Sequence, residues 1–178
     1  MRVLRHTEAL CTCAGILFCA MTLLELVYFR SLSGGIMSVD MRPLGFTPDD
    51  GFEWTTALGP RGSETVIVWH YLTFDLLFPA LFGLALASLI IRLGMNFPRF
   101  QKLPSRIRDG FGLALAAPGV LADYAQNFAV TRILSNPLSA TPESWTVASG
   151  LIVTKFALYA VPLTVIVAFL LASRKYAK

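Results

Sequence analysis

Four residues with polar or ionisable side chains interrupt long apolar stretches of this sequence: Asp75, Asp123, Asn127 and Lys155. A charged side chain in hydrocarbon costs at least about 2.5–3.5 kcal/mol, so such residues usually face the interior of a helix bundle. Asn127 follows Asp123 by four residues, which places the two on one helix face. The simplest arrangement pairs Lys155 with one or both aspartates and lets Asn127 complete the hydrogen bonds.

Three further residues support this polar cluster: Tyr71, Gln126 and Tyr159. Each tyrosine lies four residues from a charged member of the cluster and therefore shares a helix face with it. Glu25 is an outlier, because at 1.5 Å per residue it lies only about 7 Å from the end of its apolar stretch. We expect its side chain to extend toward Arg30.

Three interpretations of the cluster remain open. Ionisable groups inside a membrane commonly form a proton, ion or substrate site. The same groups can instead form a satisfied polar network that only fixes helix packing. In the third interpretation the protein is a lipid-modifying enzyme that uses Asp75 or Asp123 as a general base. Such an enzyme needs a head-group pocket beside Pro79 or Pro118. The sequence contains no recognisable catalytic motif, so we assign no catalytic residue.

The histidines and cysteines predict neither a metal site nor a cofactor. Cys11, Cys13 and Cys19 lie in one apolar stretch without a CxxC or zinc-type spacing, and we expect them to pack as small apolar residues. His6 and His70 are predicted near opposite membrane faces, which argues against a haem held between them.

Four apolar stretches carry these residues, at positions 9–29, 66–91, 111–134 and 145–172. Each is long enough to cross a hydrocarbon core of about 30 Å as a helix. Hydrophobic residues make up 55% of the chain and charged residues 15%, against about 25% charged residues in soluble domains. We therefore expect an all-α membrane protein, a bundle of four transmembrane helices in one domain of residues 1–178.

The first apolar stretch is longer than the hydrophobic region of a signal peptide and no A-x-A cleavage site follows it, so we expect this stretch to be retained in the protein.

Each of the last three stretches contains a proline, at Pro79, Pro118 or Pro162. Packed membrane helices tolerate proline, although the residue removes a backbone donor and frees the carbonyl four residues earlier. For Pro79 this carbonyl belongs to Asp75, a member of the polar cluster.

The basic residues predict the orientation. Ten of the fifteen Lys and Arg residues lie near the termini or between the second and third stretches, including Arg174, Lys175 and Lys178. Because cytoplasmic loops concentrate Lys and Arg, we expect both termini in the cytoplasm. The linker 96–108 alternates apolar residues with cations and is predicted to lie among anionic lipid head groups. The net charge of +4 therefore indicates a lipid partner and not nucleic acid.

The outer segment, residues 31–65, contains signals for a short helix. Thr47-Pro48-Asp49-Asp50 is typical of a helix start, with a threonine cap, proline at the first position and acids in the first turn. Gly59-Pro60 is a stop signal. We expect an amphipathic helix over Pro48–Leu58 that lies on the outer membrane surface and seals the bundle, although Gly51 weakens it.

Several motifs are shared with one group of proteins: Met41 to Asp50, Ala57 to Gly62, Asp75-x-x-Phe78-Pro79, Asp123-x-x-Gln126-Asn127 and Thr154-Lys155. In these motifs the chain resembles an uncharacterised family of small four-span integral membrane proteins. The resemblance implies the four-span fold and supplies no activity. This chain has Gln126 at the position where the family has glutamate. The resemblance therefore implies no role for this position that requires a carboxylate.

A face of small residues, Gly83, Ala85 and Ala87, follows Pro79 in the second apolar stretch. Small residues let helix backbones approach closely in a membrane. If this face is free, it favours a structural or accessory subunit that binds a membrane-protein partner or a second copy of the chain.

Overall fold

The computed structural model describes the backbone of residues 2–176 and the side chains of residues 2–173, and this part of the chain forms helices and turns without a strand. Its elements are the 3-10 turn η1 (Val3–Arg5), α1 (Thr7–Leu23), the π-helix η2 (Leu24–Phe29), α2 (Arg30–Leu32), the 3-10 turn η3 (Val39–Met41), α3 (Pro48–Val66), the π-helix η4 (Ile67–Phe74), α4 (Asp75–Gly94), α5 (Pro98–Gln101), α6 (Ser105–Ser135), the 3-10 turn η5 (Pro137–Ser139) and α7 (Pro142–Tyr176). The predicted all-α class is confirmed. The side chains of Arg174, Lys175 and Lys178, which contribute to the predicted orientation, lie outside the described residues.

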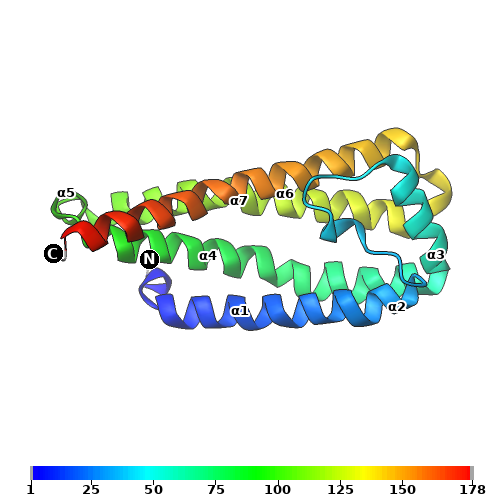
Figure 1. Ribbon diagram of the computed structural model, residues 1–178, viewed down its shortest axis with the longest axis horizontal. Coiled ribbons are helices and arrows are strands. Elements are labelled where there is room, and N and C mark those ends of the chain that lie inside the picture. The colour runs from blue at the N-terminus through cyan, green and yellow to red at the C-terminus, as the bar shows by residue number, and fades with distance from the viewer. Residues whose placement is uncertain (1, 177–178) are drawn as a thin grey trace.

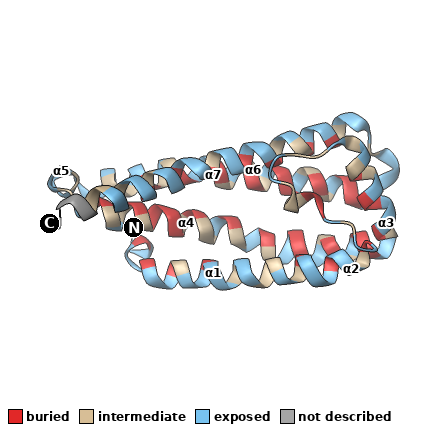
Figure 2. Cartoon of the chain, in the orientation of Figure 1, coloured by how far each residue is buried: buried red, intermediate tan, exposed pale blue. Residues whose placement is uncertain are grey.

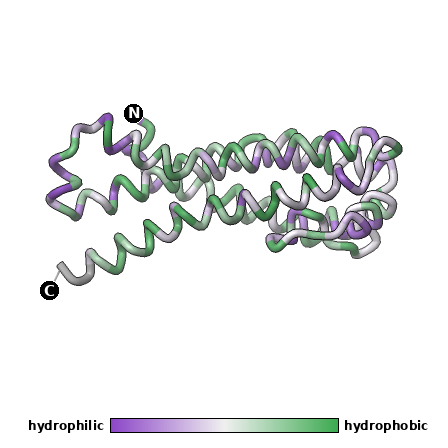
Figure 3. The backbone as a smooth tube through the Cα atoms, turned by 90° about the horizontal axis from the view of Figure 1, so that it is seen from above, coloured by the Kyte–Doolittle hydropathy of each residue, from purple (hydrophilic) through white to green (hydrophobic). Residues whose placement is uncertain are grey.

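The long helices α1, α4, α6 and α7 run side by side along the molecule, and its two ends are built differently (Figure 1). The chain ends and α5 lie at one end, which we call the termini end. At the other end α3 and the loop before it fold across the helices (Figure 1). We call residues 33–58 the cap. Hydrophilic residues are frequent at both ends, while hydrophobic residues predominate along the helices between them (Figure 3).

Three helical stretches are long and apolar enough to cross a membrane: Thr7–Leu32, Pro48–Gly94 and Pro142–Ser173. The helix α6, which contains the predicted span 111–134, is not among them. The polar residues Asp123, Gln126 and Asn127 lie in the middle of this helix and lower its apolar character. The number of spans therefore stays a prediction.

The outward faces of the long helices are exposed (Figure 2), and many of their exposed residues are large and apolar. Ile16 of α1 is 65% exposed and Phe128 of α6 is 72% exposed. Soluble monomers rarely show extensive apolar surface of this kind, whereas lipid requires it. Cys13 and Cys19 belong to this exposed apolar surface, while Cys11 is partly buried.

Towards the termini end, α4 and α6 touch through glycine. A Cβ atom at Gly112 would lie 2.8 Å from the carbonyl oxygen of Ala87, and one at Gly83 would lie 2.4 Å from Val120. Ala85 is buried against α1. The small-residue face therefore packs within the chain, so the condition under which it would favour an accessory subunit is not met.

The helix α3 begins at Pro48 with Thr47 as its N-cap, as predicted, and the structure shows that this cap is a capping box. The Thr47 side chain accepts a hydrogen bond from the Asp50 amide at 3.3 Å, and the Asp50 carboxylate accepts one from the Thr47 amide at 2.8 Å. The first helical part of α3 ends at Leu58 as predicted, because Gly59 has the non-helical angles φ 61° and ψ −177°, and a second helical part follows it to Val66. The predicted stop signal thus bends the chain, because glycine adopts the left-handed conformation without cost, and the cap runs directly into the next long helix.

Close contacts with α7 help to hold the cap on the bundle. A Cβ atom at Gly51 would lie 2.4 Å from the indole ring of Trp145, so only glycine lets α3 approach α7 this closely. The Ser149 hydroxyl of α7 accepts a hydrogen bond from the Phe46 amide and donates one to the Phe46 carbonyl, both at 2.8 Å. Gly51 weakens the intrinsic helix propensity, but the packing requires it.

Candidate functional site

Lys155 of α7 lies at the centre of a group of buried polar side chains. Its Nζ donates to Asp123 Oδ1 at 2.9 Å and to Gln126 Oε1 at 2.6 Å, both on α6. One turn along α7, the Tyr159 hydroxyl donates to the other oxygen of Asp123 at 3.2 Å. All four side chains belong to residues no more than 7% exposed. The structure therefore brings these four sequence-selected residues together.

Asn127 contacts the backbone of Asp75 and not its carboxylate. Its Nδ2 donates to the Asp75 carbonyl oxygen at 3.2 Å. This is the carbonyl that Pro79 leaves without a helical N–H donor. Asn127 replaces the missing donor and connects α6 to the start of α4.

The cap contributes Asp40, which the sequence analysis missed. Its Oδ1 lies 3.4 Å from Lys155 Nζ, and its Oδ2 accepts a hydrogen bond from the Tyr71 hydroxyl. Burial alone would raise the pKa of Asp40, but Lys155, His70 and Tyr71 together outweigh burial and lower this pKa below its ordinary value. The second carboxylate beside Lys155 is therefore Asp40 and not Asp75.

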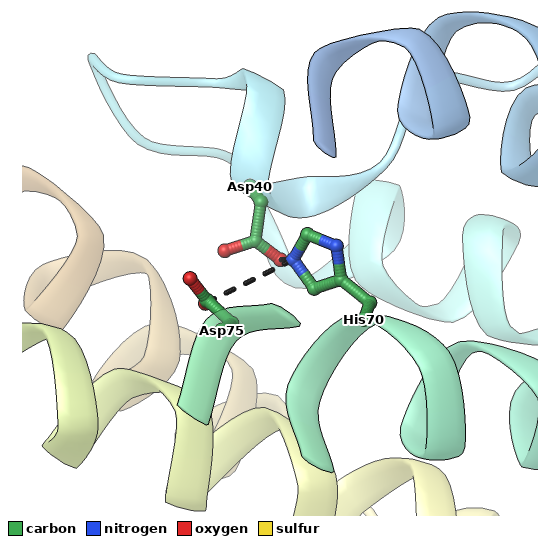
Figure 4. A group of neighbouring side chains, drawn as sticks. All are labelled: Asp40, His70 and Asp75. Carbon is green, nitrogen blue, oxygen red and sulfur yellow. Dashed lines mark ion pairs between the residues drawn. The ribbon is translucent and has the colours of Figure 1, made fainter. Parts of the chain in front are cut away.

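His70 lies among three carboxyl groups, and Figure 4 shows two of them, on Asp40 and Asp75, turned toward its ring. Its Nε2 is 3.7 Å from Asp40 Oδ2 and 3.9 Å from Asp75 Oδ2, while its Nδ1 is 3.7 Å from Glu25 Oε2. His70 is 5% exposed and Glu25 is 6% exposed. The expectation that Glu25 extends toward Arg30 is wrong, since Arg30 instead donates to the loop backbone.

Two π-helices explain why His70 and Glu25 turn inward. In an α-helix, residues five apart are rotated by about 140° about the axis, so His70 and Asp75 would face different sides. In η4 the backbone follows the wider π-helical turn, whose bonds join residues five apart, and the two side chains converge. Glu25 lies in the other π-helix, η2. Spacing along an α-helix therefore places neither Glu25 nor His70 in the cluster.

The cluster contains more acidic than basic side chains. Its carboxyl groups belong to Glu25, Asp40, Asp75 and Asp123, and its basic groups to His70 and Lys155. If all six groups are charged, two negative charges remain without a counter-ion. An uncompensated charge is costly at a buried position.

Several buried polar atoms of the cluster have no hydrogen-bond partner among the described residues: Glu25 Oε2, His70 Nδ1, Gln126 Nε2 and Asn127 Oδ1. Buried polar groups in native proteins are usually bonded to protein, water or an ion. The cluster therefore has hydrogen-bonding capacity that its own side chains do not use.

No protein-family model, curated protein or solved structure matches this chain. The function is therefore argued from the geometry and charge of the cluster.

Proposed function

We propose that this chain is a four-span integral membrane protein that binds a cation in the buried cluster beneath its cap. The excess of carboxyl groups carries the proposal, since four acids face two bases at buried positions. A metal ion, a proton or a small cationic solute would supply the missing positive charge. A network that served only to fix helix packing would gain most from balanced charges, because each unpaired buried charge destabilises the fold.

The fourth span in this proposal is α6. This helix packs against both α4 and α7. Leu121 and Phe128 are exposed on its outer side, while Asp123, Gln126 and Asn127 are buried against the neighbouring helices. Polar residues that lower the hydropathy of a span are accommodated when they face the interior of the bundle.

The proposed orientation places the termini end in the cytoplasm and the cap outside. The excess of Lys and Arg around the termini and the 96–108 linker supports it. In this orientation the linker lies against anionic head groups of the inner leaflet.

Cysteine labelling tests the orientation. In a background without Cys11, Cys13 and Cys19, one cysteine is introduced at Ser139 or at Ser105, both of which are exposed. An impermeant maleimide should label position 139 in intact cells and position 105 only after permeabilisation. The reverse pattern would overturn the orientation.

Thermal unfolding in lipid nanodiscs tests cation binding. The melting temperature is measured against sodium, potassium, calcium, zinc, manganese and choline, and in a pH series. A ligand at 100 times its Kd stabilises the folded state by about 2.7 kcal/mol, so we expect at least one cation to raise the melting temperature. Asp75→Asn should abolish this rise, and Glu8→Gln, whose side chain is 84% exposed, should retain it. If no cation shifts the wild-type protein, the cluster is a packing network and the proposal fails.

A further inference from the structure

One side of the cluster has the donor chemistry of a metal site. Asp40, His70 and Asp75 each offer one ligand atom, and these atoms all lie within 4.8 Å of one another. The three side chains come from two parts of the chain, the cap and the stretch from η4 to α4 (Figure 4). A metal here would join the cap to the second long helix.

The distances between these atoms suit a metal better than direct bonding. Zinc binds histidine nitrogen and carboxylate oxygen at about 2.0–2.2 Å, which places tetrahedral ligands about 3.4 Å apart. His70 Nε2 lies 3.7 Å from Asp40 Oδ2 and 3.9 Å from Asp75 Oδ2. Both distances are too long for hydrogen bonds and slightly longer than the spacing between the ligands of a bound metal. The Asp75 carboxylate also makes no hydrogen bond within the described part of the chain.

Neighbouring residues support the three ligands as metal sites require. A metal-binding histidine commonly donates its second ring nitrogen to a carboxylate, and Glu25 Oε2 lies 3.7 Å from His70 Nδ1. These two atoms are buried and have no hydrogen-bond partner among the residues described. The Tyr71 hydroxyl bonds the Asp40 carboxylate, which orients a second ligand.

We infer that Asp40, His70 and Asp75 bind a divalent metal ion of the zinc or manganese type, with Glu25 as a positioning residue for His70. The inference rests on the proposed function and specifies its cation. Imidazole together with two carboxylates is a donor set that suits these ions. A divalent ion bound to neutral His70 reduces the excess of negative charge in the cluster from two to one.

Isothermal titration tests the inference with zinc chloride and manganese chloride, added separately to chelator-treated protein in nanodiscs. We expect one ion per chain and a loss of affinity of more than 100-fold in Asp40→Asn, His70→Gln and Asp75→Asn. Glu25→Gln should lose about 10–100-fold, the effect typical of outer-shell residues. His6→Gln is the matched control, because His6 is exposed and is the only other histidine in the chain, and its affinity should be unchanged.

Hydrogen exchange on the wild-type protein keeps the inference testable if a variant fails to fold. Because Asp40 belongs to the cap, zinc or manganese should slow exchange of amides 36–47 more than exchange of amides 136–141 in the loop around η5. Equal exchange with and without metal would contradict the inference.

The outcomes separate the inference from the proposed function. If neither metal binds but another cation raises the melting temperature through Asp75, the metal inference is overturned and the proposed function stands. If metal binds with equal affinity to the ligand variants and the wild type, binding is adventitious and the inference is overturned. If no cation acts at all, both fail.

Discussion

The two halves of the bundle are held together in different ways. In the half toward the termini end, apolar residues such as Leu86, Ile90 and Ile166 form the core, and Gly112 brings α6 against the Ala87 backbone. In the half toward the cap, charged and aromatic side chains fill the interior around Lys155. Helices that touch through glycine leave no room for side chains, whereas helices joined by long polar side chains depend on charge balance. Apolar packing and close glycine contacts therefore hold the half toward the termini end, whereas the half toward the cap adds a buried ion network to its apolar core.

Lys155→Met should have the largest effect, confined to the cap half. It removes the cation that contacts both Asp123 and Asp40. Breaking a buried ion pair from one side costs about 3–5 kcal/mol, which reversible unfolding in detergent would measure. Thr154→Val changes an exposed neighbour on the same helix and should have little effect. Equal stabilities of the two variants would show that the contacts of Lys155 with Asp123 and Asp40 do not stabilise the fold.

A double-mutant cycle separates the two carboxylates near Lys155 from the third. Asp40→Asn and Asp123→Asn each leave the lysine one carboxylate, so together they should cost up to about 3 kcal/mol beyond the sum of the single changes. Asp75→Asn with Asp123→Asn should show a smaller coupling than the first pair, because no hydrogen bond or ion pair joins Asp75 to the lysine. If Asp75 and Asp123 are coupled while Asp40 and Asp123 are not, Asp75 and not Asp40 is the second carboxylate that pairs with Lys155.

In the half toward the termini end, Gly112→Ala tests packing by shape. The added Cβ would lie 2.8 Å from a backbone oxygen, which cannot move aside as a side chain can. Overpacking of this kind costs about 1–3 kcal/mol. Gly110→Ala is the matched control on the same helix, since its Cβ would meet nothing within 4 Å, and its stability should equal or exceed that of the wild type. A Gly112→Ala variant as stable as this control would contradict the close contact.

The smallest expected effect concerns Asn127 and Pro79. Asn127→Ala removes the donor to the Asp75 carbonyl and should cost about 0.5–1.5 kcal/mol. In a Pro79→Ala background the alanine N–H can bond this carbonyl, so the same change should cost less. Unfolding free energies of the four proteins in the cycle measure the difference. An unchanged cost would show that Asn127 does not substitute for the missing backbone donor.

Regular helical spacing made part of this site predictable. Asp123, Gln126 and Asn127 lie on a continuous α-helix, as does Lys155, so residue spacing placed them on facing sides. The start of α3 was predictable for a local reason, because its capping box needs only residues within one turn.

The rest of the site could not be predicted because its backbone is irregular. Asp40 lies in a loop, where no periodicity relates it to Lys155, 115 residues away. Glu25 and His70 lie in π-helices, which change the direction of every side chain relative to an α-helix. The small-residue face was recognised, but the sequence alone does not say whether such a face binds another chain or its own helices.

The separation of Asp40 and Lys155 along the chain also bears on biosynthesis. Chains are made from the N-terminus, so Glu25, Asp40, Asp75 and Asp123 all emerge from the ribosome before the lysine that balances them. Until α7 is inserted, the acids share only His70 as a basic neighbour within the cluster. Completion of the ion network thus coincides with arrival of the last helix. A chain truncated before α7 would therefore retain Asp40 and Asp123 without the lysine that pairs with them.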